Sequence, residues 1–347
     1  MRFANGSVNN ILLFVPLKMK FPLRIILDIS IYGDDHMVVF WILLALALLV
    51  LGITYYCYRF CFYVKDKAII GPDEYPIPEG KIYEPHREQM VAWMKEVRAL
   101  PYREYWITSH DGLKLYGKYY ECVPGAPMEL MFHGYRGNAE RDLCGGVQRA
   151  FSLGHNVLIV DQRASCHSDG RVISFGANEH KDCLRWLELA IREFGPDVQV
   201  ILTGISMGAT TVLLAAGTEL PKNVIGVLAD CGYTSAHEII QVVAKLIKLP
   251  PKLSYPFVRL AARVFGHFDL ESADATKALA NCKVPVIFYH GEDDKFVPCY
   301  MSQKNYDACP SRKRLVTTPG AGHGLCYLVD PEGYLKAARE FFHGDTE

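Results

Sequence analysis

Short apolar runs alternate with helix-length segments along most of this 347-residue chain, and this alternation restricts its fold more than any other feature. The runs are apolar at nearly every position rather than at every second one, which is typical of strands covered by helices on both faces. Residues 138–153, 177–194 and 207–216 have the composition and spacing of helices. We therefore expect an α/β domain with a mostly parallel sheet. Its strands are predicted at 129–132, 156–160, 198–202, 224–228, 286–289 and 314–317.

A hairpin is predicted before the first of these strands. Residues 103–107 and 113–120 are rich in aromatic and apolar side chains, and Asp111-Gly112 between them is a hairpin turn signal. The globular part should therefore begin with an antiparallel pair.

A longer insertion, at about 233–281, interrupts the alternation and is predicted to form a small helical lid. Apolar residues at helical spacing indicate one helix that ends at Pro250 and Pro251, and residues 257–265 indicate a second. The insertion is basic. It is either an ordinary helical excursion over the sheet edge or a cap that shapes the substrate site. Its basic residues include Lys245, Lys248, Arg259 and Arg263.

Residues 37–56 carry no charge, and this stretch has the length that an α-helix needs to cross about 30 Å of hydrocarbon. Aromatic residues follow it up to Tyr63, as in the aromatic belts at membrane–water interfaces. We predict a single-pass anchor at 37–63 in contact with the lipid bilayer. A removed signal peptide, which usually has a shorter apolar run, and a buried helix of a soluble protein are the alternatives.

Basic residues on both sides of the span determine its orientation only weakly. Arg59 and Lys65 follow the span closely, whereas the nearer charged residues before it are Asp34 and Asp35. The positive-inside rule therefore places the carboxy-terminal bulk in the cytoplasm. Met37 is an alternative start of the chain, and that start would remove the basic residues further upstream, Lys18, Lys20 and Arg24.

These features divide the chain into four parts. We expect an amino-terminal segment of unassigned structure at 1–36, the transmembrane anchor at 37–63, a linker with a helix before the domain at 64–101, and the α/β domain at 102–347. Three prolines between residues 72 and 78 are typical of a stiff, extended linker.

Charge and cysteine usage exclude several classes of protein. With 37 basic and 38 acidic residues and no long basic stripe, the chain lacks the charge of a nucleic-acid binder. Its 11 cysteines form no CxxC pair, which argues against a disulfide framework or a zinc site and favours a reducing compartment. Glycine motifs for nucleotides and histidine spacings for metals are missing too. We expect no cofactor and no metal, and the sequence identifies no protein partner.

The pentapeptide Gly204-Ile205-Ser206-Met207-Gly208 follows the predicted strand 198–202 and begins a run of helix formers. This strand-turn-helix context is the one in which such a motif exposes a nucleophilic serine. The two glycines prevent side chains from colliding where strand and helix nearly touch. We therefore predict Ser206 as a nucleophile.

A serine hydroxyl needs a base within hydrogen-bond reach and an acid that orients this base. Asp293 and Asp294 lie in the polar loop after strand 286–289, and His323 lies between glycines after the last predicted strand. Both loops follow the carboxyl ends of strands, where open α/β sheets place their sites. The order along the chain is Ser, Asp, His.

These motifs resemble those of the α/β-hydrolase superfamily, and the resemblance extends from about Tyr102 to the end of the chain. The family's acid loop commonly reads Gly-x-x-Asp-x-x-Val-Pro, which selects Asp294 over Asp293. Asp230 is a minor alternative, because some relatives take the acid from that strand end. The resemblance thus implies an α/β-hydrolase fold with Ser206, Asp294 and His323 as its catalytic triad.

The resemblance also implies an oxyanion hole. The segment His133-Gly134-Tyr135 follows strand 129–132, where the family places its second donor, so the backbone N–H groups of Tyr135 and Met207 are the predicted donors. We interpret His133 as a structural loop residue rather than as a second base. Alternatively, Tyr135 contributes only its ring, as a pocket wall.

Residues 161–170 are similar to the family's Asp-x-Arg-Gly-x-Gly-x-Ser loop, except that Ala164 and Cys166 replace the usual glycines. This departure weakens the match of the loop but leaves the triad intact. Asp161 and Arg163 are expected to hold loops together. Similar loops occur in membrane-anchored bacterial relatives of the prolyl-oligopeptidase-like branch, whose propeller domain this chain is too short to contain.

The sequence therefore predicts a membrane-anchored serine hydrolase that cleaves lipophilic carboxyl esters through an acyl-enzyme intermediate. Amide or peptide hydrolysis is the first alternative, and thioester hydrolysis the second. A binding or scaffold protein on a hydrolase frame is the alternative from another class, because a fold does not determine a function.

Overall fold

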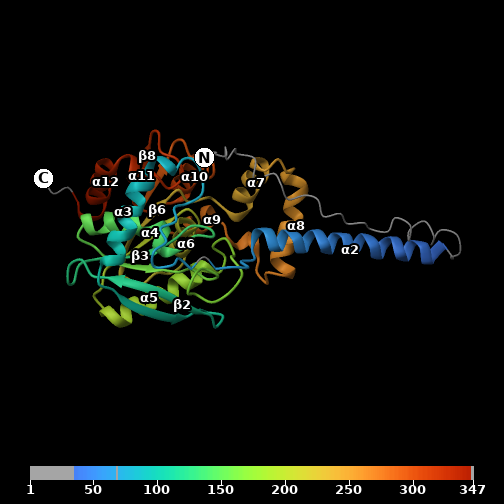
Figure 1. The fold of residues 1–347 in the computed structure, drawn as a ribbon, viewed down its shortest axis with the longest axis horizontal. Helices are drawn as coiled ribbons and strands as arrows, with labels where there is room; N and C mark the ends of the chain where they lie inside the picture. The colour runs from blue at the N-terminus through green and yellow to red at the C-terminus, as the bar shows by residue number, and fades with distance from the viewer. Residues whose placement is uncertain (1–34, 68, 345–347) are drawn as a thin grey trace, which may run out of the picture. The chain divides into compact units, whose positions relative to one another are not determined.

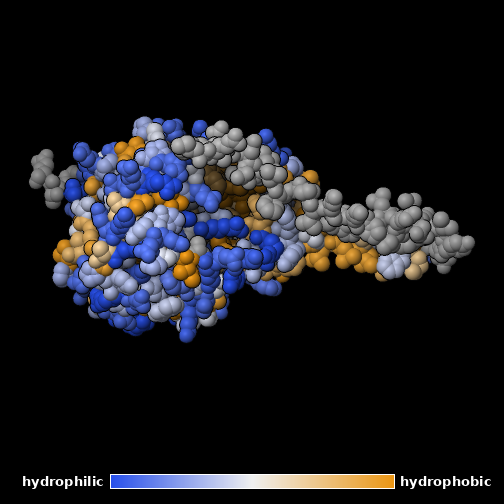
Figure 2. Space-filling view, viewed as in Figure 1, coloured by the Kyte–Doolittle hydropathy of each residue, from blue (hydrophilic) through white to orange (hydrophobic). Residues whose placement is uncertain are grey.

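The structure is a computed structural model that describes residues 35–67 and 69–344. Helix α2 (Asp35–Cys61) is long and apolar enough, from His36 to Cys61, to cross a membrane by length and composition. Figure 2 shows the side chains of α2 in orange where grey atoms do not cover them. Nearly all of the predicted segment 1–36, including the basic residues counted for the orientation, lies outside the described residues.

Residues up to Gly52 form one unit and Ile53–Glu347 form a second, so the last turns of α2 belong to the globular unit. This unit contains one eight-stranded sheet in the order β1-β2-β4-β3-β5-β6-β7-β8. The pairs β1–β2 and β2–β4 are antiparallel and all other pairs are parallel, which confirms the predicted sheet. The strands are β1 (Arg103–Thr108), β2 (Lys114–Tyr120), β3 (Met128–Phe132), β4 (Asn156–Val160), β5 (Val200–Ile205), β6 (Val224–Asp230), β7 (Val286–Gly291) and β8 (Lys313–Thr318).

Helices cover both faces of the sheet (Figure 1), and neighbouring residues of one strand pack on opposite faces. Leu130 of β3 packs with the helices of one face, and Met131 packs with those of the other. This two-sided burial explains why the strands are apolar throughout. One face carries α5 (Glu179–Phe194), α6 (Met207–Ala216), α9 (Ala275–Leu279) and α10 (Tyr300–Ala308), and the other carries α3 (Arg87–Ala99), α4 (Ala139–Ser152), α11 (Cys326–Val329) and α12 (Pro331–His343).

The insertion after β6 consists of α7 (Ala236–Leu246), α8 (Pro251–Val264) and the short turn η3 (Leu270–Ser272). The second helix begins six residues earlier than the predicted 257–265. Pro251 occupies its first turn, where a missing N–H costs no hydrogen bond and the fixed φ suits a helix. The first helix, however, already ends at Leu246, and Lys248 beyond it has a φ of 59°, so the proline pair starts the second helix but does not end the first.

Residues before the domain pack onto it. After the short turn η2 (Glu84–His86), helix α3 buries Met94 and Val97 against the sheet, and Ile77 and Tyr83 of the proline-rich segment are buried as well. The Tyr83 hydroxyl donates to the His323 carbonyl at 3.0 Å. The segment thereby reaches the loop after β8.

A buried ionic cluster connects β3, α4 and β4. Glu129 forms a two-pronged ion pair with Arg149 and accepts hydrogen bonds from His155 at 2.9 Å and from Thr203 at 2.8 Å. Burial raises the pKa of Glu129, but Arg149 and His155 lower it by more, to about 2. Glu129 is therefore a carboxylate over nearly the whole pH range.

We expect Glu129→Gln to destabilise the domain by about 3–5 kcal/mol, because Arg149 would keep a buried charge without a counter-ion. The ordinary pKa of Glu129 is 4.5, so the native carboxylate stabilises the wild type above that value, and this stability is lost as the pH falls towards 2. Thermal unfolding of the full chain in detergent between pH 2 and pH 6 checks both points. A variant that melts with the wild type at pH 6 would contradict the prediction.

Candidate active site

Ser206 lies at the sharp turn between β5 and α6, with φ 56° and ψ −118°. Non-glycine residues rarely adopt this conformation, and it persists only where the surrounding packing enforces it. Its backbone N–H donates to the Asp230 carbonyl at 2.8 Å, and its carbonyl accepts from Thr210 at 3.1 Å. The strained turn therefore lies between β5 and α6, and hydrogen bonds to β6 and α6 hold it in place.

The two glycines of the pentapeptide allow this close approach. A Cβ atom on Gly208 would lie 2.0 Å from the carbonyl oxygen of Phe132 in β3, and one on Gly204 would lie 2.2 Å from backbone atoms of Gly208. Both distances are far below contact, and the obstructing atoms are backbone atoms that cannot move aside. The sequence interpretation of these glycines agrees with the packing.

The structure brings Ser206, His323 and Asp294 together. His323 Nε2 lies 2.9 Å from Ser206 Oγ, and His323 Nδ1 lies 2.6 Å from Asp294 Oδ2. Asp294 lies after β7 and His323 after β8, at the carboxyl ends of adjacent parallel strands. With a proton on Nδ1, the imidazole donates to the carboxylate and accepts from the serine hydroxyl. The three groups thus form one continuous hydrogen-bonded chain.

Asp294 is the acid that contacts the imidazole. Its Oδ1 accepts from the backbone N–H groups of Phe296 and Val297, each at 2.9 Å. Burial raises the pKa of Asp294, but hydrogen bonds from His290 and His323 lower it by more, so the pKa lies well below its usual range. Asp294 therefore stays ionised and can stabilise an imidazolium.

Neither of the alternative acids takes this place. Asp293 is exposed to solvent beside the buried Asp294. Asp230 is buried and accepts from the Tyr334 hydroxyl at 3.2 Å, and burial raises its pKa. An acid with a raised pKa is a poor partner for a cationic imidazole.

The two segments that carry the predicted oxyanion donors, the start of α6 and the loop after β3, both adjoin Ser206. Met207 is the first residue of α6, so its N–H has no partner within the helix and lies at the positive end of the helix dipole. In the loop after β3, a Cβ atom on Gly134 would lie 3.5 Å from Ser206 Cβ, and the Gly134 N–H donates to Asp142 at 3.2 Å. The loop that carries Tyr135 is therefore fixed directly beside the nucleophile.

The side chain of Tyr135 binds the end of α2, so only its backbone N–H is a candidate oxyanion donor. Its hydroxyl donates to the Cys61 carbonyl at 2.7 Å, and Arg136 donates to the Phe60 carbonyl at 2.7 Å. The last carbonyls of a helix have no partner within the helix, and a cation near them is favourable. The loop beside Ser206 thus caps the carboxyl end of α2.

Two other predicted loop residues are structural. His133 is buried, its Nδ1 lies 2.8 Å from the Gly134 carbonyl, and its Nε2 accepts from the Gln162 N–H at 3.0 Å. Arg163 forms a two-pronged pair with Asp182, with distances of 2.6 and 2.7 Å, and a second pair with Asp111. Neither side chain is free to act on a substrate.

Ala164 and Cys166, which replace the family's usual glycines, have φ values of 63° and 36°. Both lie in the left-handed region, which costs an L-residue about 1–2 kcal/mol. The backbone of this loop therefore keeps the conformation that glycine would favour, although the side chains differ.

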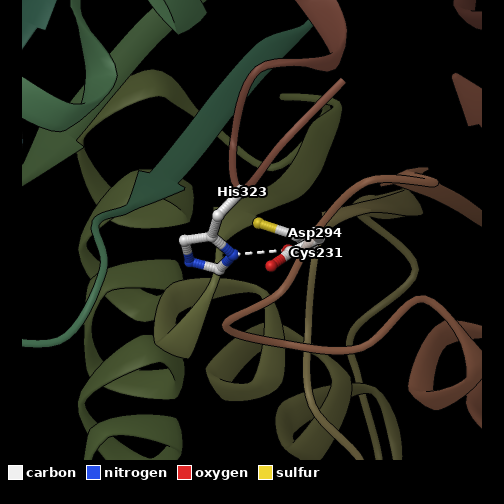
Figure 3. Close-up of side chains that lie close together, drawn as sticks. All are labelled: Cys231, Asp294 and His323. Carbon is white, nitrogen blue, oxygen red and sulfur yellow. Dashed lines mark hydrogen bonds and ion pairs between the residues drawn. The ribbon is translucent and has the colours of Figure 1, made fainter. Parts of the chain in front are cut away.

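Figure 3 shows that Cys231 lies beside Asp294 and His323, and the three offer possible metal-ligand atoms within 4.8 Å of one another. Burial raises the pKa of the Cys231 thiol well above its usual value, which disfavours the thiolate that a metal requires. Both Asp294 oxygens are already hydrogen-bond acceptors. A second such group, His110, Asp111 and Asp182, binds Arg163 through its carboxylates. These donor sets fit ion pairs and a proton relay better than a cation.

Sequence reasoning missed three residues that position the site. Tyr83 holds the carbonyl of His323, His290 lies 3.4 Å from Asp294 Oδ2, and Asp142 holds the N–H of Gly134. His290 lies next to the acid loop and Asp142 lies shortly after the segment His133-Gly134-Tyr135. This closeness to a motif is the only sequence signal for either residue. Tyr83 is 240 residues from its partner along the chain and has no local signal.

A cavity of about 280 Å³ lies beside Met207. Its wall combines the chain just after α2 with the loops around Gly137 and Ala164. The lining is partly apolar, from Tyr63 and Ile173, and partly basic. It adjoins one of the two predicted oxyanion donors.

Comparisons with known proteins agree with this architecture. A family model described as the alpha/beta hydrolase fold matches residues 130–267. An esterase from Pyrococcus furiosus has a TM-score of 0.57 at 22% identity, covering 80% of this chain and 98% of that structure. The family model and this structure agree that the chain has the α/β-hydrolase fold. The structure of Est1E from Butyrivibrio proteoclasticus with bound ferulic acid has a TM-score of 0.53 at 22% identity and covers 68% of this chain and 97% of that chain. At these identities the likeness shows the fold.

Relatives in sequence match only in part. An uncharacterised protein of Bacillus subtilis is 27% identical over 192 residues, which are 54% of this chain and 62% of that protein. An uncharacterised membrane protein of Saccharomyces cerevisiae is 23% identical over 190 residues, which are 54% of this chain and 61% of that one. The chain spans about three fifths of the length of these relatives.

We expect Gly208→Ala to destabilise the domain severely, by more than about 4 kcal/mol, because the new methyl group would overlap the backbone of β3. Thermal unfolding of the full chain in detergent measures the loss. Gly52→Ala in α2 is the control for changing a glycine elsewhere, since a Cβ atom there would meet nothing within 4 Å and the backbone is helical. A Gly208→Ala variant that melts within 2 °C of the wild type would contradict this account of the turn.

Proposed function

We propose that the protein is a membrane-anchored serine hydrolase that cleaves carboxyl esters. The observation that carries the proposal is the hydrogen-bonded chain from Asp294 through His323 to Ser206, at the end of which the serine lies on a strained turn. A cluster of polar residues has no structural need for this strain, whereas a nucleophile held at the turn between a strand and a helix does.

In the proposed reaction, Ser206 Oγ attacks the acyl carbon while His323 Nε2 takes the hydroxyl proton. The tetrahedral oxyanion is stabilised by the N–H groups of Met207 and Tyr135. The bond to the alcohol then breaks, and the alcohol leaves with the proton from His323. Water, deprotonated by His323, next attacks the acyl-enzyme and releases the acid with free Ser206. Throughout, Asp294 holds neutral His323 in the tautomer with the proton on Nδ1, and it stabilises the imidazolium when His323 is protonated.

The names of several similar proteins support carboxyl esters as the substrates of this chain. The neighbours from Pyrococcus furiosus and Exiguobacterium antarcticum are esterases by name. A bifunctional esterase/perhydrolase of Acinetobacter calcoaceticus is 36% identical over 64 residues, which are 17% of this chain and 23% of that protein. Amides and thioesters use the same machinery and differ in the leaving group, so they are the alternatives that a substrate panel must test.

The proposed localisation is a membrane. Helix α2 is a single-pass anchor in the lipid bilayer, and the hydrolase domain lies in the cytoplasm. The length and apolar surface of α2 support the span. Arg59 in its last turn and Lys65 and Lys67 after it support the orientation. The Saccharomyces cerevisiae relative is named a membrane protein. An anchored esterase would act on lipophilic esters that partition into the same bilayer.

We expect Ser206→Ala to abolish covalent labelling by a fluorophosphonate probe, because this probe requires an activated serine oxygen. Ser152→Ala, which changes an exposed serine at the end of α4, should label like the wild type. Gel fluorescence of the full chain in detergent measures both variants. Equal labelling of Ser206→Ala and wild type, or no labelling of either, would favour the scaffold alternative.

We expect Asp294→Asn to lower kcat on a short-chain ester by about 10⁴-fold, since the amide would stabilise the wrong imidazole tautomer. Asp293→Asn changes the neighbouring exposed carboxylate and should leave kcat within about twofold. Steady-state turnover of both variants, with circular dichroism to verify folding, makes the comparison. An equal loss in the two variants would argue against the assignment of the acid.

A matched set of one acyl group as ester, thioester and anilide then tests the substrate class. We expect the ester to have the highest kcat/KM, and we expect longer acyl chains to be preferred. An anilide that is turned over at the rate of the ester would instead favour the amidase alternative.

A further inference from the structure

Exposed apolar side chains of the globular unit are concentrated in the lid. Among the described residues outside α2, fourteen large apolar side chains are exposed, and six of these lie between residues 246 and 264. Single exposed apolar residues are normal on a soluble surface, but a contiguous group marks an interaction site. The six are Leu246, Ile247, Leu249, Leu253, Leu260 and Val264.

Helix α8 divides into a buried side and a two-part outer side. Tyr255, Val258, Ala261 and Ala262 face the core of the lid. On the outer side, residues three, four or seven apart form two neighbouring ridges along the helix. The apolar ridge consists of Leu253, Leu260 and Val264, and the basic ridge consists of Lys252, Arg259 and Arg263.

The basic charge of this region is only partly balanced. Arg259 lies 3.8 Å from Glu271, and Arg263 lies 3.9 Å from Asp269. Lys245, Lys248 and Lys252 are exposed and form no ion pair within the described part of the chain. An apolar ridge flanked by exposed lysines is the pattern of a helix that lies in the plane of a membrane interface, with lysines reaching the headgroups.

The end of α8 lies beside the last turns of α2 (Figure 1). The Phe265 ring, directly after α8, lies 5.3 Å from the ring of Tyr55 and 5.6 Å from the ring of Tyr58. Both tyrosines lie near the carboxyl end of the candidate span, where aromatic residues mark the level of the membrane interface. The outer side of α8 thus begins at the depth at which headgroups would lie.

We propose that the outer side of α8 and the α7–α8 turn form a second membrane contact, which binds the anionic headgroup layer of the bilayer that α2 spans. The apolar ridge inserts to the boundary between headgroups and acyl chains, and the lysines pair with anionic lipids. This inference rests on the membrane anchor of the proposed function. It adds a lipid class, and it makes the lid a surface that meets the bilayer rather than water.

The test uses the full chain in nanodiscs with the substitution Leu253→Trp, and the fluorescence of the wild type is subtracted as background. Lipids brominated near the top of the acyl chain quench tryptophans at that depth. Val123→Trp, at an exposed apolar position between β2 and β3, is the matched control. We expect quenching at position 253 and none at position 123, and stronger quenching with phosphatidylglycerol than with phosphatidylcholine alone.

Substitution of Lys245, Lys248 and Lys252 by Gln should remove most of the quenching at position 253, since each lysine near an anionic surface strengthens partitioning by about fivefold. The same change at the exposed lysines Lys181, Lys222 and Lys283 should not. Quenching that is equal at positions 253 and 123, or independent of anionic lipid, would overturn the proposal. A blue shift at position 253 without quenching would also overturn it and would point to a protein occupant such as a second copy.

The failures of the two proposals can be separated. A chain that enters nanodiscs and labels with fluorophosphonate, but whose residue 253 is not quenched, refutes only the lid contact. A chain that fails to enter nanodiscs refutes the anchor and the lid contact with it. Loss of labelling by Ser206→Ala is independent of both results.

Discussion

The close approach of α6 to β3 and β5 is the constraint on which the rest of the site depends. At Gly208 the helix meets the carbonyl of Phe132 with no room for a methyl group, and the chain must therefore reverse sharply at Ser206. The reversal places the serine oxygen at the carboxyl end of β5, within reach of His323, and leaves the Met207 N–H without a partner inside α6. The loops after β7 and β8 then need only ordinary lengths to bring Asp294 and His323 to the same edge.

Hydrogen bonds join the carboxyl end of α2 to the loop beside Ser206. Tyr135 and Arg136 belong to the loop beside Ser206 and bind the final carbonyls of α2. Unpaired helix carbonyls are costly when buried, so the loop and the helix end stabilise each other. A displacement of this helix end would therefore move the loop that carries one predicted oxyanion donor. Under the proposed function, this would connect the anchor to the chemistry at Ser206.

Sequence reasoning worked where the signal was local. The strands around the site follow from apolar runs. Motifs with a readable strand context also brought together Ser206, Asp294 and His323, which the hydrogen bonds join, whereas their catalytic roles stay predictions. It gave β5 as 198–202 rather than Val200–Ile205, because the Val198 N–H forms a turn with Gly195 instead of a ladder bond. It could not find Tyr83, whose partner is set by tertiary packing, and it treated Ala164 and Cys166 as departures although their backbone keeps the conformation of glycine.

The proposed membrane contact would give the lid a physical role, which its sequence alone left open between an excursion and a cap. A single transmembrane helix fixes the distance of a domain from a bilayer but leaves the domain free to tilt. A second contact along α8 would oppose that tilt, because tilting would pull the apolar ridge out of the headgroup layer. The hydrogen bonds from Tyr135 and Arg136 to the end of α2 would pass this restraint to the loop beside Ser206. The span α2 and the outer side of α8 would then together set how the catalytic edge faces lipophilic esters in the bilayer. Neither contact would need to touch the substrate.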